Sequence, residues 1–336
     1  MRRAITPGRL LLASAALAVL LVVLGWVVPA GDYLYIPNPP QPLDGKVQVE
    51  GGKKPPPPGQ ISYVDVSIRQ ATWGERLLPF LRPGGSSLVD RDLVVPPGTS
   101  FDERRDEGRA QMDRSERVAA AVALRAAGFP VRARPRGALV EGVDPSVPAA
   151  GVLEYGDVIV TAGGRRVRTP ADLRAAVGTV RPGDPLGLRL RRGGSTRSVR
   201  VTTIEDPREP GRPLIGIRVG QDASIELPVE VKIDLGDVGG PSAGLPFALD
   251  VLEQLGRDVD HGYDVVATGE IELDGTVVSV GAVKQKAFAV RAAGADVFLV
   301  PGDNADEARR YAGDVRVIPV ESFQQALQQL QTLPRK

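Results

Sequence analysis

Ser242 lies in the stretch GDVGGPSAGLPFALDVL, where a glycine-rich loop runs into an apolar segment. Pro241 fits the first position of a helix, so Ser242 falls in the first turn. Free backbone N–H groups and the positive helix end converge there, and they can stabilise a serine alkoxide or the oxyanion that follows attack. Gly240, Ala243 and Gly244 lack bulk, which lets a substrate carbonyl approach. The loop therefore contains a candidate nucleophile.

Two other interpretations of this loop stay open on the residues alone. A capping serine in a glycine-rich turn is the commoner use of such a stretch, and a phosphate cradle is the other. The chain contains no G-x-x-x-x-G-K-[ST] run, which argues against the standard nucleotide loop. A nucleophile also needs a base. The chain has one histidine, His261 in the polar run DVDHGYD, and no cysteine.

Two lysines open a segment that reads as a helix from about Val283 to Ala293 and that ends at Gly294. At about 100° per residue, Lys286 falls on the stripe that should face inward and Lys284 on the opposite face. The inward stripe also contains Val283, Val290 and Ala293. Desolvation lowers the pKa of such a lysine and makes it a usable base. Lys284 is expected to be a solvated charge, whereas an ion pair or a snorkelling side chain is the alternative for Lys286.

The elements expected around these residues mix strands and helices. The helix after Ser242 has an apolar face, and Pro246 comes too late for its first position, which predicts a kink in the second turn. Two strands are expected at Leu214–Val219 and Leu227–Leu235. A hairpin turn is expected at Asp274–Gly275, and a returning strand at Val297–Val300.

Short strands separated by turns fill the region from Val131 onward, with a helix at Pro170–Val177. The run GALVEGVDPSVPAAGVLEYGDVIVTAGGRRVRTPADLRAAV resembles a PDZ domain, over roughly Val131 to Ile204. The nearest match to a loop that binds a peptide carboxylate is Gly128–Val131. Its proline has no N–H, which argues against carboxylate capture, while strand addition beside the helix stays open. Strands are expected at Ala138–Val143, Asp157–Ala162, Leu186–Arg192 and Ser198–Thr203.

GGPSAG followed by ATGEI, a DG turn, GAVKQK, an alanine-rich helix and an FLVP strand resembles the proteolytic domain of the Lon-type serine peptidases, over about Leu214 to Leu330. The resemblance implies that Ser242 is the nucleophile, that Lys286 is its general base and that the Thr268 hydroxyl helps to orient the lysine. A Ser–Lys dyad then takes the place of a histidine triad. The family has no base position at His261, and it needs neither a metal nor a cofactor for this chemistry.

The chain departs from the ATP-dependent Lon proteins before this domain. A PDZ-like module and an apolar segment stand in place of an ATPase module, and Gly239 occupies a position where many relatives carry an acid. The arrangement resembles the smaller branch of membrane-anchored PDZ–Lon proteins. Without an unfolding motor, the implied substrates are flexible segments or already unfolded chains.

The N-terminus is expected to anchor the protein. Arg2, Arg3 and Arg9 precede the uncharged stretch Leu10–Gly31, and about 20 apolar residues span a bilayer as a helix. Trp26 suits the interface, and the arginines predict a cytoplasmic N-terminus with the bulk of the chain outside. A signal peptide cleaved near Val28-Pro29-Ala30 is the alternative. Its apolar region usually runs only about 7–15 residues, which favours the uncleaved anchor.

Between the anchor and the PDZ-like module, two alternating strands at Lys46–Glu50 and Gln60–Ile68 are expected to pair with each other, across a polyproline loop at Pro55–Pro58. A helix is expected from Ser100, with a capping box at Glu103, to Gly128. The half of this helix from Val118 onward is expected to be buried.

The sequence thus predicts an α+β multidomain protein. Its parts are a transmembrane anchor (1–31), a β/helical segment (32–127), a PDZ domain (128–206) and a Lon-type proteolytic domain (210–333). The formal net charge of +1 argues against a nucleic-acid partner. A chain without cysteine forms no disulfide and has no Cys-ligated metal. Expected partners are unfolded or flexible proteins and the membrane, and an oligomer is compatible with the sequence. A catalytically silent scaffold that binds protein tails is the alternative function.

Overall fold

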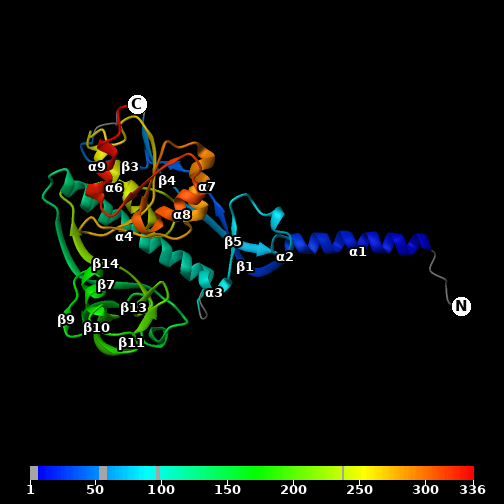
Figure 1. Ribbon diagram of the computed structural model, residues 1–336, viewed down its shortest axis with the longest axis horizontal. Helices are drawn as coiled ribbons and strands as arrows, with labels where there is room; N and C mark the ends of the chain where they lie inside the picture. The colour runs from blue at the N-terminus through cyan, green and yellow to red at the C-terminus, as the bar shows by residue number, and fades with distance from the viewer. Residues whose placement is uncertain (1–6, 53–58, 96–98, 237) are drawn as a thin grey trace.

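The computed structural model describes residues 7–52, 59–95, 99–236 and 238–336. Arg2, Arg3, the polyproline run at 55–58 and Asp237 of the serine loop lie outside these ranges. Figure 1 shows a long N-terminal helix, α1 (Pro7–Val27), that projects from a body made of two larger units. One unit contains the serine loop, and the other contains the PDZ-like module.

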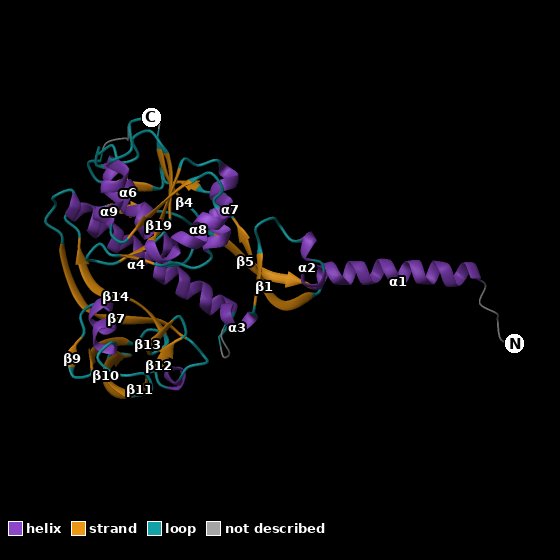
Figure 2. Ribbon diagram, in the orientation of Figure 1, coloured by secondary structure: helices purple, strands orange, loops and turns teal. Residues whose placement is uncertain are grey.

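The first unit is a five-stranded sheet between two layers of helices (Figure 2). Its strand order is β2 (Gln41–Pro42), β4 (Gln60–Tyr63), β16 (Asp264–Ala267), β19 (Val297–Pro301) and β20 (Arg316–Val320). The last four strands are parallel and β2 is antiparallel. One apolar cluster packs α4 (Phe101–Ala126), α6 (Gly244–Gln254) and α9 (Phe323–Gln331) on one face, and another packs α7 (Val283–Ala293) and α8 (Ala305–Tyr311) on the other.

Two of these strands precede the PDZ-like module in the chain, and the expected pairing of residues 46–50 with 60–68 is wrong. β3 (Val47–Val49) instead pairs with β15 (Val231–Ile233), and β4 pairs in parallel with β16. Ile61, Ser62 and Tyr63 are all buried, so β4 is covered on both faces. Such burial is typical of a central parallel strand rather than of a hairpin arm with one exposed face.

Helix α4 matches its prediction. Ser100 caps it in a capping box with Glu103, and the chain leaves the helix at Ala127 and at Gly128, whose φ is +89°. Its C-terminal half is buried against α6 and belongs to the core of the first unit. The expected burial from Val118 onward is confirmed, and its purpose is packing.

The PDZ-like unit has a separate aliphatic core. Its sheet runs β11 (Ser195–Thr202), β10 (Pro185–Arg192), β8 (Val158–Ala162), β7 (Arg132–Val143) and β14 (Ile217–Glu226), with β9 (Arg165–Arg166) beside β8. Helix α5 (Pro170–Val177) starts at a capping box formed by Thr169 and Asp172. A two-stranded ribbon, β12 (Ile204–Asp206) and β13 (Glu209–Leu214), leads into the edge strand β14.

A small sheet joins α1 to the body. It consists of β5 (Val66–Thr72), β1 (Pro29–Pro37) and β6 (Ser87–Val89). The short helices α2 (Trp73–Leu77) and η1 (Pro79–Leu81) lie between β5 and β6 in the chain, and α3 (Arg91–Val94) follows β6. The expected helix to Gly31 is wrong at its end, because α1 stops at Val27 and β1 begins at Pro29. Among the residues that the structure describes, no helix has the length and apolarity needed to cross a membrane.

Candidate active site

Ser242 lies in a single 3-10 turn, η3 (Pro241–Ala243), that runs directly into α6. Gly240 precedes the turn at φ +93°, a conformation that a residue with a side chain rarely adopts. Because α6 itself starts at Gly244, Pro246 is its third residue, where a backbone N–H has no partner within the helix. The expected kink at Pro246 therefore has no cause, since proline costs little in the first turn.

The structure brings together the three polar side chains that the sequence singled out. Lys286 Nζ donates to Ser242 Oγ at 2.9 Å and to Thr268 Oγ1 at 2.9 Å. Thr268 Oγ1 in turn donates to the Ser242 carbonyl at 3.2 Å. Lys286 is only 4% exposed and Thr268 is fully buried, whereas Ser242 is half-buried and faces a cavity. Two hydroxyls thus hold one buried amine, and only one of them is open to a substrate.

Burial lowers the pKa of Lys286 from 10.5 to about 8, and the negative charge of Asp65 opposes part of this shift. Among the residues that the structure describes, two hydroxyls are the hydrogen-bond partners of the buried ammonium, and they replace its lost hydration only in part. With a pKa of about 8, about a tenth of the amine is neutral at pH 7 and about half at pH 8, and the neutral amine is the form that can accept a proton from Ser242.

Hydrogen bonds from other segments of the chain hold the serine turn in place. Gly240 N donates to Gly108 O at 2.8 Å, and Gly269 N donates to Ser242 O at 2.8 Å. Ser115 Oγ, from the buried face of α4, donates to Pro241 O at 3.0 Å. The Pro241 carbonyl and the Ser242 N–H belong to one peptide plane, so the Ser115 contact sets the direction of that N–H. Sequence reasoning missed Ser115, because its contact with the loop is entirely tertiary.

Helix α4 also explains the glycine at position 239. A Cβ atom there would lie 3.2 Å from the Gly108 carbonyl carbon and 3.4 Å from its Cα. The two glycines let the serine loop approach the α4 backbone closely enough for the Gly240–Gly108 hydrogen bond. An acidic side chain at this position would require α4 to move.

The helical phase predicted for the two lysines is correct in its main point. Lys286 faces inward with Val283 and Val290, and the predicted start and end of α7 match, with Gly294 in the left-handed conformation. Two details differ. Ala293 is exposed, because it lies in the last turn, and Lys284 is half-buried, because its Nζ donates to Ser87 Oγ at 3.1 Å and lies over the Tyr311 ring.

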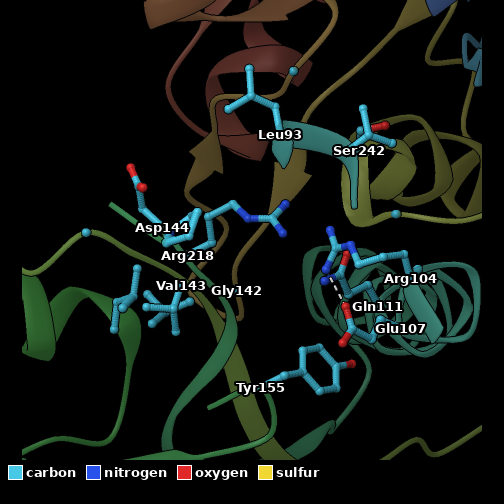
Figure 3. Close-up of a pocket in the computed structure, with 18 of the residues that line it drawn as sticks. Leu93, Arg104, Glu107, Gln111, Gly142, Val143, Asp144, Tyr155, Arg218 and Ser242 are labelled. Carbon is cyan, nitrogen blue, oxygen red and sulfur yellow. Dashed lines mark hydrogen bonds and ion pairs between the residues drawn. The ribbon is translucent and has the colours of Figure 1, made fainter. Parts of the chain in front are cut away.

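A cavity of about 1610 Å³ opens in front of Ser242 and Lys286. Its walls come from α4, from the Asp65–Ile68 segment and from the PDZ-like unit, where Leu173 and Val177 of α5 face Ile217 and Val219 of β14. Figure 3 shows Arg104 of α4 and Arg218 of β14 entering the cavity from different walls. The groove of the PDZ-like unit and the serine therefore share one space.

The loop that borders this groove is not the one expected from the sequence. Gly128–Val131 follows α4, and the segment that lines the cavity ahead of the edge strand is instead Pro213–Gly216. Gly216 has a φ of +68°, and its carbonyl accepts from Asp144 N at 2.9 Å. In the sequence, this loop could have been recognised by Gly216, a glycine flanked by two aliphatic residues at the start of a strand.

The remaining candidates lie elsewhere. His261 occupies a turn, where its N–H donates to Asp258 Oδ1 at 3.0 Å and its carbonyl accepts from Lys336 N at 3.1 Å. Glu253, Asp258 and Asp260 have carboxylate oxygens within 4.8 Å of one another. Glu253 accepts from the Val259 and Asp260 N–H groups, and burial raises its pKa to about 7. These contacts give the cluster a structural role in closing the turn after α6.

Comparison with protein families matches residues 108–203 to the PDZ domain and residues 225–332 to the Lon protease (S16) C-terminal proteolytic domain. Lon protease 2 of Bacillus subtilis is 30% identical over 113 residues, which cover 34% of this chain and 19% of that protein. Lon protease 1 of Sorangium cellulosum is 32% identical over 120 residues, which cover 32% of this chain and 14% of that protein. The chain thus spans less than a fifth of the length of these relatives.

Among solved structures, the PDZ domain of an SdrC-like protein from Listeria monocytogenes is 26% identical, with a TM-score of 0.24. The match covers 25% of this chain and 87% of that one. The family matches place the sequence-predicted modules in the order expected. The chain carries a PDZ domain followed by a Lon protease C-terminal proteolytic domain, and these similarities support a serine endopeptidase as its enzyme class.

Proposed function

We propose that the protein is an ATP-independent serine endopeptidase that cleaves unfolded or flexible protein segments with a Ser242–Lys286 dyad. The observation that carries the proposal is the 2.9 Å contact between Lys286 Nζ and Ser242 Oγ at the wall of a large open cavity. The buried lysine has the lowered pKa that a general base needs, and Thr268 holds it in place.

In the proposed reaction, the Lys286 amine takes the proton of Ser242 as Oγ attacks the peptide carbonyl carbon. The tetrahedral oxyanion accepts from the Ser242 N–H, whose direction the Ser115 contact with the Pro241 carbonyl sets. The protonated lysine then gives its proton to the leaving amine, and an ester of Ser242 with the acyl part remains. Water, deprotonated by the same lysine, hydrolyses that ester and restores the serine hydroxyl.

The PDZ domain is proposed to present substrate. β14 is one of the two edge strands of its sheet, and an extended segment can add to such an edge through backbone hydrogen bonds. Because the groove beside β14 and Ser242 share one cavity, a bound segment can reach the serine without domain movement. A silent scaffold that only binds tails would have no use for the buried amine beside Ser242.

A fluorophosphonate probe tests this proposal directly. Such a probe is expected to label the full chain at one site, and peptide mapping should place the label on Ser242. The silent scaffold predicts no labelling, and labelling of another serine would contradict the dyad.

The Ser115 contact leads to a prediction of moderate size. Ser115→Ala should lower kcat by roughly fivefold with little change in KM, since a hydrogen bond of this kind contributes about 1 kcal/mol. Inhibition by a peptide boronate, which mimics the tetrahedral intermediate, should weaken by a similar factor. The matched control is Thr203→Val, which also removes a buried hydroxyl that donates to backbone carbonyls, at 2.8 and 2.9 Å. Equal kcat values for Ser115→Ala and the parent chain would contradict the assignment.

We also propose that the N-terminal segment anchors the protein in a membrane, with the N-terminus cytoplasmic and the domains outside. The proposal is supported by the uncharged stretch Leu10–Gly31 after three arginines and by the exposed apolar side chains near the end of α1. Figure 1 shows that helix α1 projects away from the body. A protease added to intact cells should then digest the region after Asp32. Protection in intact cells, with digestion only after lysis, would contradict this orientation.

A further inference from the structure

The short segment that follows β5 exposes its largest apolar side chains. Trp73, Leu77, Leu78 and Phe80, here called the α2 surface, are all exposed, and Leu77 and Phe80 reach 69% and 79%. Four large apolar residues in an eight-residue segment of a water-soluble surface would normally pack inward. In the functioning protein, this apolar surface therefore faces either an apolar medium or another molecule.

The buried carboxylate and the backbone carbonyls of the same segment are bound by groups within the protein. Glu75 is 3% exposed, and its carboxylate accepts from both Arg69 Nη atoms and from Thr72 N at 3.0 Å. Arg82 Nε donates to the Glu75 carbonyl at 2.6 Å and Arg82 Nη2 donates to the Arg76 carbonyl at 3.2 Å. The segment thus satisfies its charged and backbone groups within the protein, which leaves the outward face apolar.

The α2 surface adjoins the end of α1. Trp73 N donates to Val28 O at 3.2 Å, and a Cβ atom on Gly74 would lie 3.2 Å from Gly25 O, so the two backbones nearly touch. The neighbouring end of α1 also exposes Trp26 and Val27. Figures 1 and 2 show α2 beside the point where α1 leaves the body. The two elements therefore form one apolar region at that level.

Arginine accompanies the aromatic residues in this region. The Arg76 guanidinium lies 5.5 Å from the Trp73 ring centre, and its Nη1 pairs with Asp32 at 2.8 Å. Tryptophan with arginine, beside an apolar helix, is the composition of segments that lie at the boundary between lipid headgroups and acyl chains. A second copy of the chain is a poorer occupant, since a stable interface takes about 20–30 residues a side.

We propose that the α2 surface lies in the interfacial layer of a lipid bilayer, with Trp73, Leu77, Leu78 and Phe80 among the headgroups and upper acyl chains. This inference rests on the anchoring part of the proposed function and is independent of the proteolytic part. It fixes the body against the membrane by two elements, α1 and α2, so that the body cannot swing freely about the end of α1.

The chain has two tryptophans, Trp26 and Trp73, which makes the surface measurable by fluorescence. The full chain carrying Trp26→Phe is reconstituted into phosphatidylcholine–phosphatidylglycerol vesicles that contain lipids brominated at shallow or deep positions. Trp73 emission should be quenched about twofold more by the shallow than by the deep bromines, as for a group about 5–10 Å below the surface. The aqueous control is Tyr155→Trp in a chain with both natural tryptophans replaced by phenylalanine, because Tyr155 is exposed on the PDZ domain.

The chain carrying Trp73→Phe, in which Trp26 reports on α1, separates the outcomes. Lipid quenching of Trp26 without quenching of Trp73 overturns the α2 proposal and leaves the anchor standing. Quenching of neither tryptophan overturns both. Protection of Trp73 from aqueous iodide without quenching by brominated lipid indicates a protein occupant, which also overturns the proposal. Proteolytic activity is not needed for any of these results.

Discussion

Ser242→Ala is expected to abolish cleavage of an unfolded protein such as casein, with a loss of kcat on the order of 10⁵-fold, because the nucleophile is removed and no neighbouring hydroxyl can replace it. Thr268 Oγ1 also contacts Lys286, but Thr268 is fully buried and a substrate carbonyl cannot reach it. Casein cleavage measured by gel, together with thermal unfolding of the variant, checks the prediction.

The fold should survive this substitution. Ser242 makes no capping hydrogen bond at the start of η3, so alanine should cost at most about 0.5–2 kcal/mol, the range for a lost cap. Ser198→Ala, at an exposed position of the PDZ domain, is the matched control and should retain full activity. Undiminished cleavage by Ser242→Ala would remove the basis of the dyad.

Substitution of the two lysines of α7 should give opposite results. Lys286→Ala, or the closer match Lys286→Met, is expected to eliminate activity, whereas Lys284→Ala should leave it largely unchanged. Lys286 contacts Ser242 Oγ from a buried position, while Lys284 contacts Ser87 and Tyr311 on another surface of the helix. Steady-state cleavage of a peptide substrate measures both variants. An essential Lys284 with a dispensable Lys286 would mean that the motif alignment is off by two residues.

The pH profile gives a second readout for Lys286. The neutral amine is the competent base, so kcat/KM of the parent chain should rise with pH and level off above a pKa of about 8. Lys284→Ala should keep this profile. A profile that is flat between pH 6 and 9 would show that a different group takes the serine proton.

The lowered pKa of Lys286 also makes the free energy of unfolding depend on pH. The direction follows from how many protons the folded and unfolded states bind. The unfolded chain holds the Lys286 proton up to a pKa of 10.5, whereas the folded chain releases it near 8. Between these values the unfolded state binds more protons, so the free energy of unfolding should rise with pH. Lys286→Met should lose this increase, which denaturant titrations between pH 8 and 10 can detect.

Local patterns were sufficient for much of the secondary structure. The capping box of Ser100 with Glu103, the paired strands near Leu186–Arg192 and Ser198–Thr203, and the end of α7 at Gly294 are found as predicted. Each depends on residues only a few positions apart, so the responsible interactions can be recognised within one short stretch of chain.

At the candidate site, helical periodicity and family resemblance identified residues that short local patterns do not. Together they selected Ser242, Lys286 and Thr268, which the structure brings within 3.2 Å of one another through side chain and backbone atoms. The periodicity was informative because α7 lies on a sheet that buries one stripe of it, and a polar residue on that stripe stands out. The catalytic roles of the three residues stay predictions until the variants are measured.

The sequence by itself determined many of the short helices and strands and which residue types could form a nucleophile and a base. Only the tertiary structure decided that β4 joins β16, that β3 joins β15, and that Ser115 and Gly108 of α4 hold the serine turn. These contacts join segments separated by the whole PDZ domain. Their free energy comes from apolar burial in a shared core and from hydrogen bonds that exist only once that core has formed, so no local pattern in the chain records them.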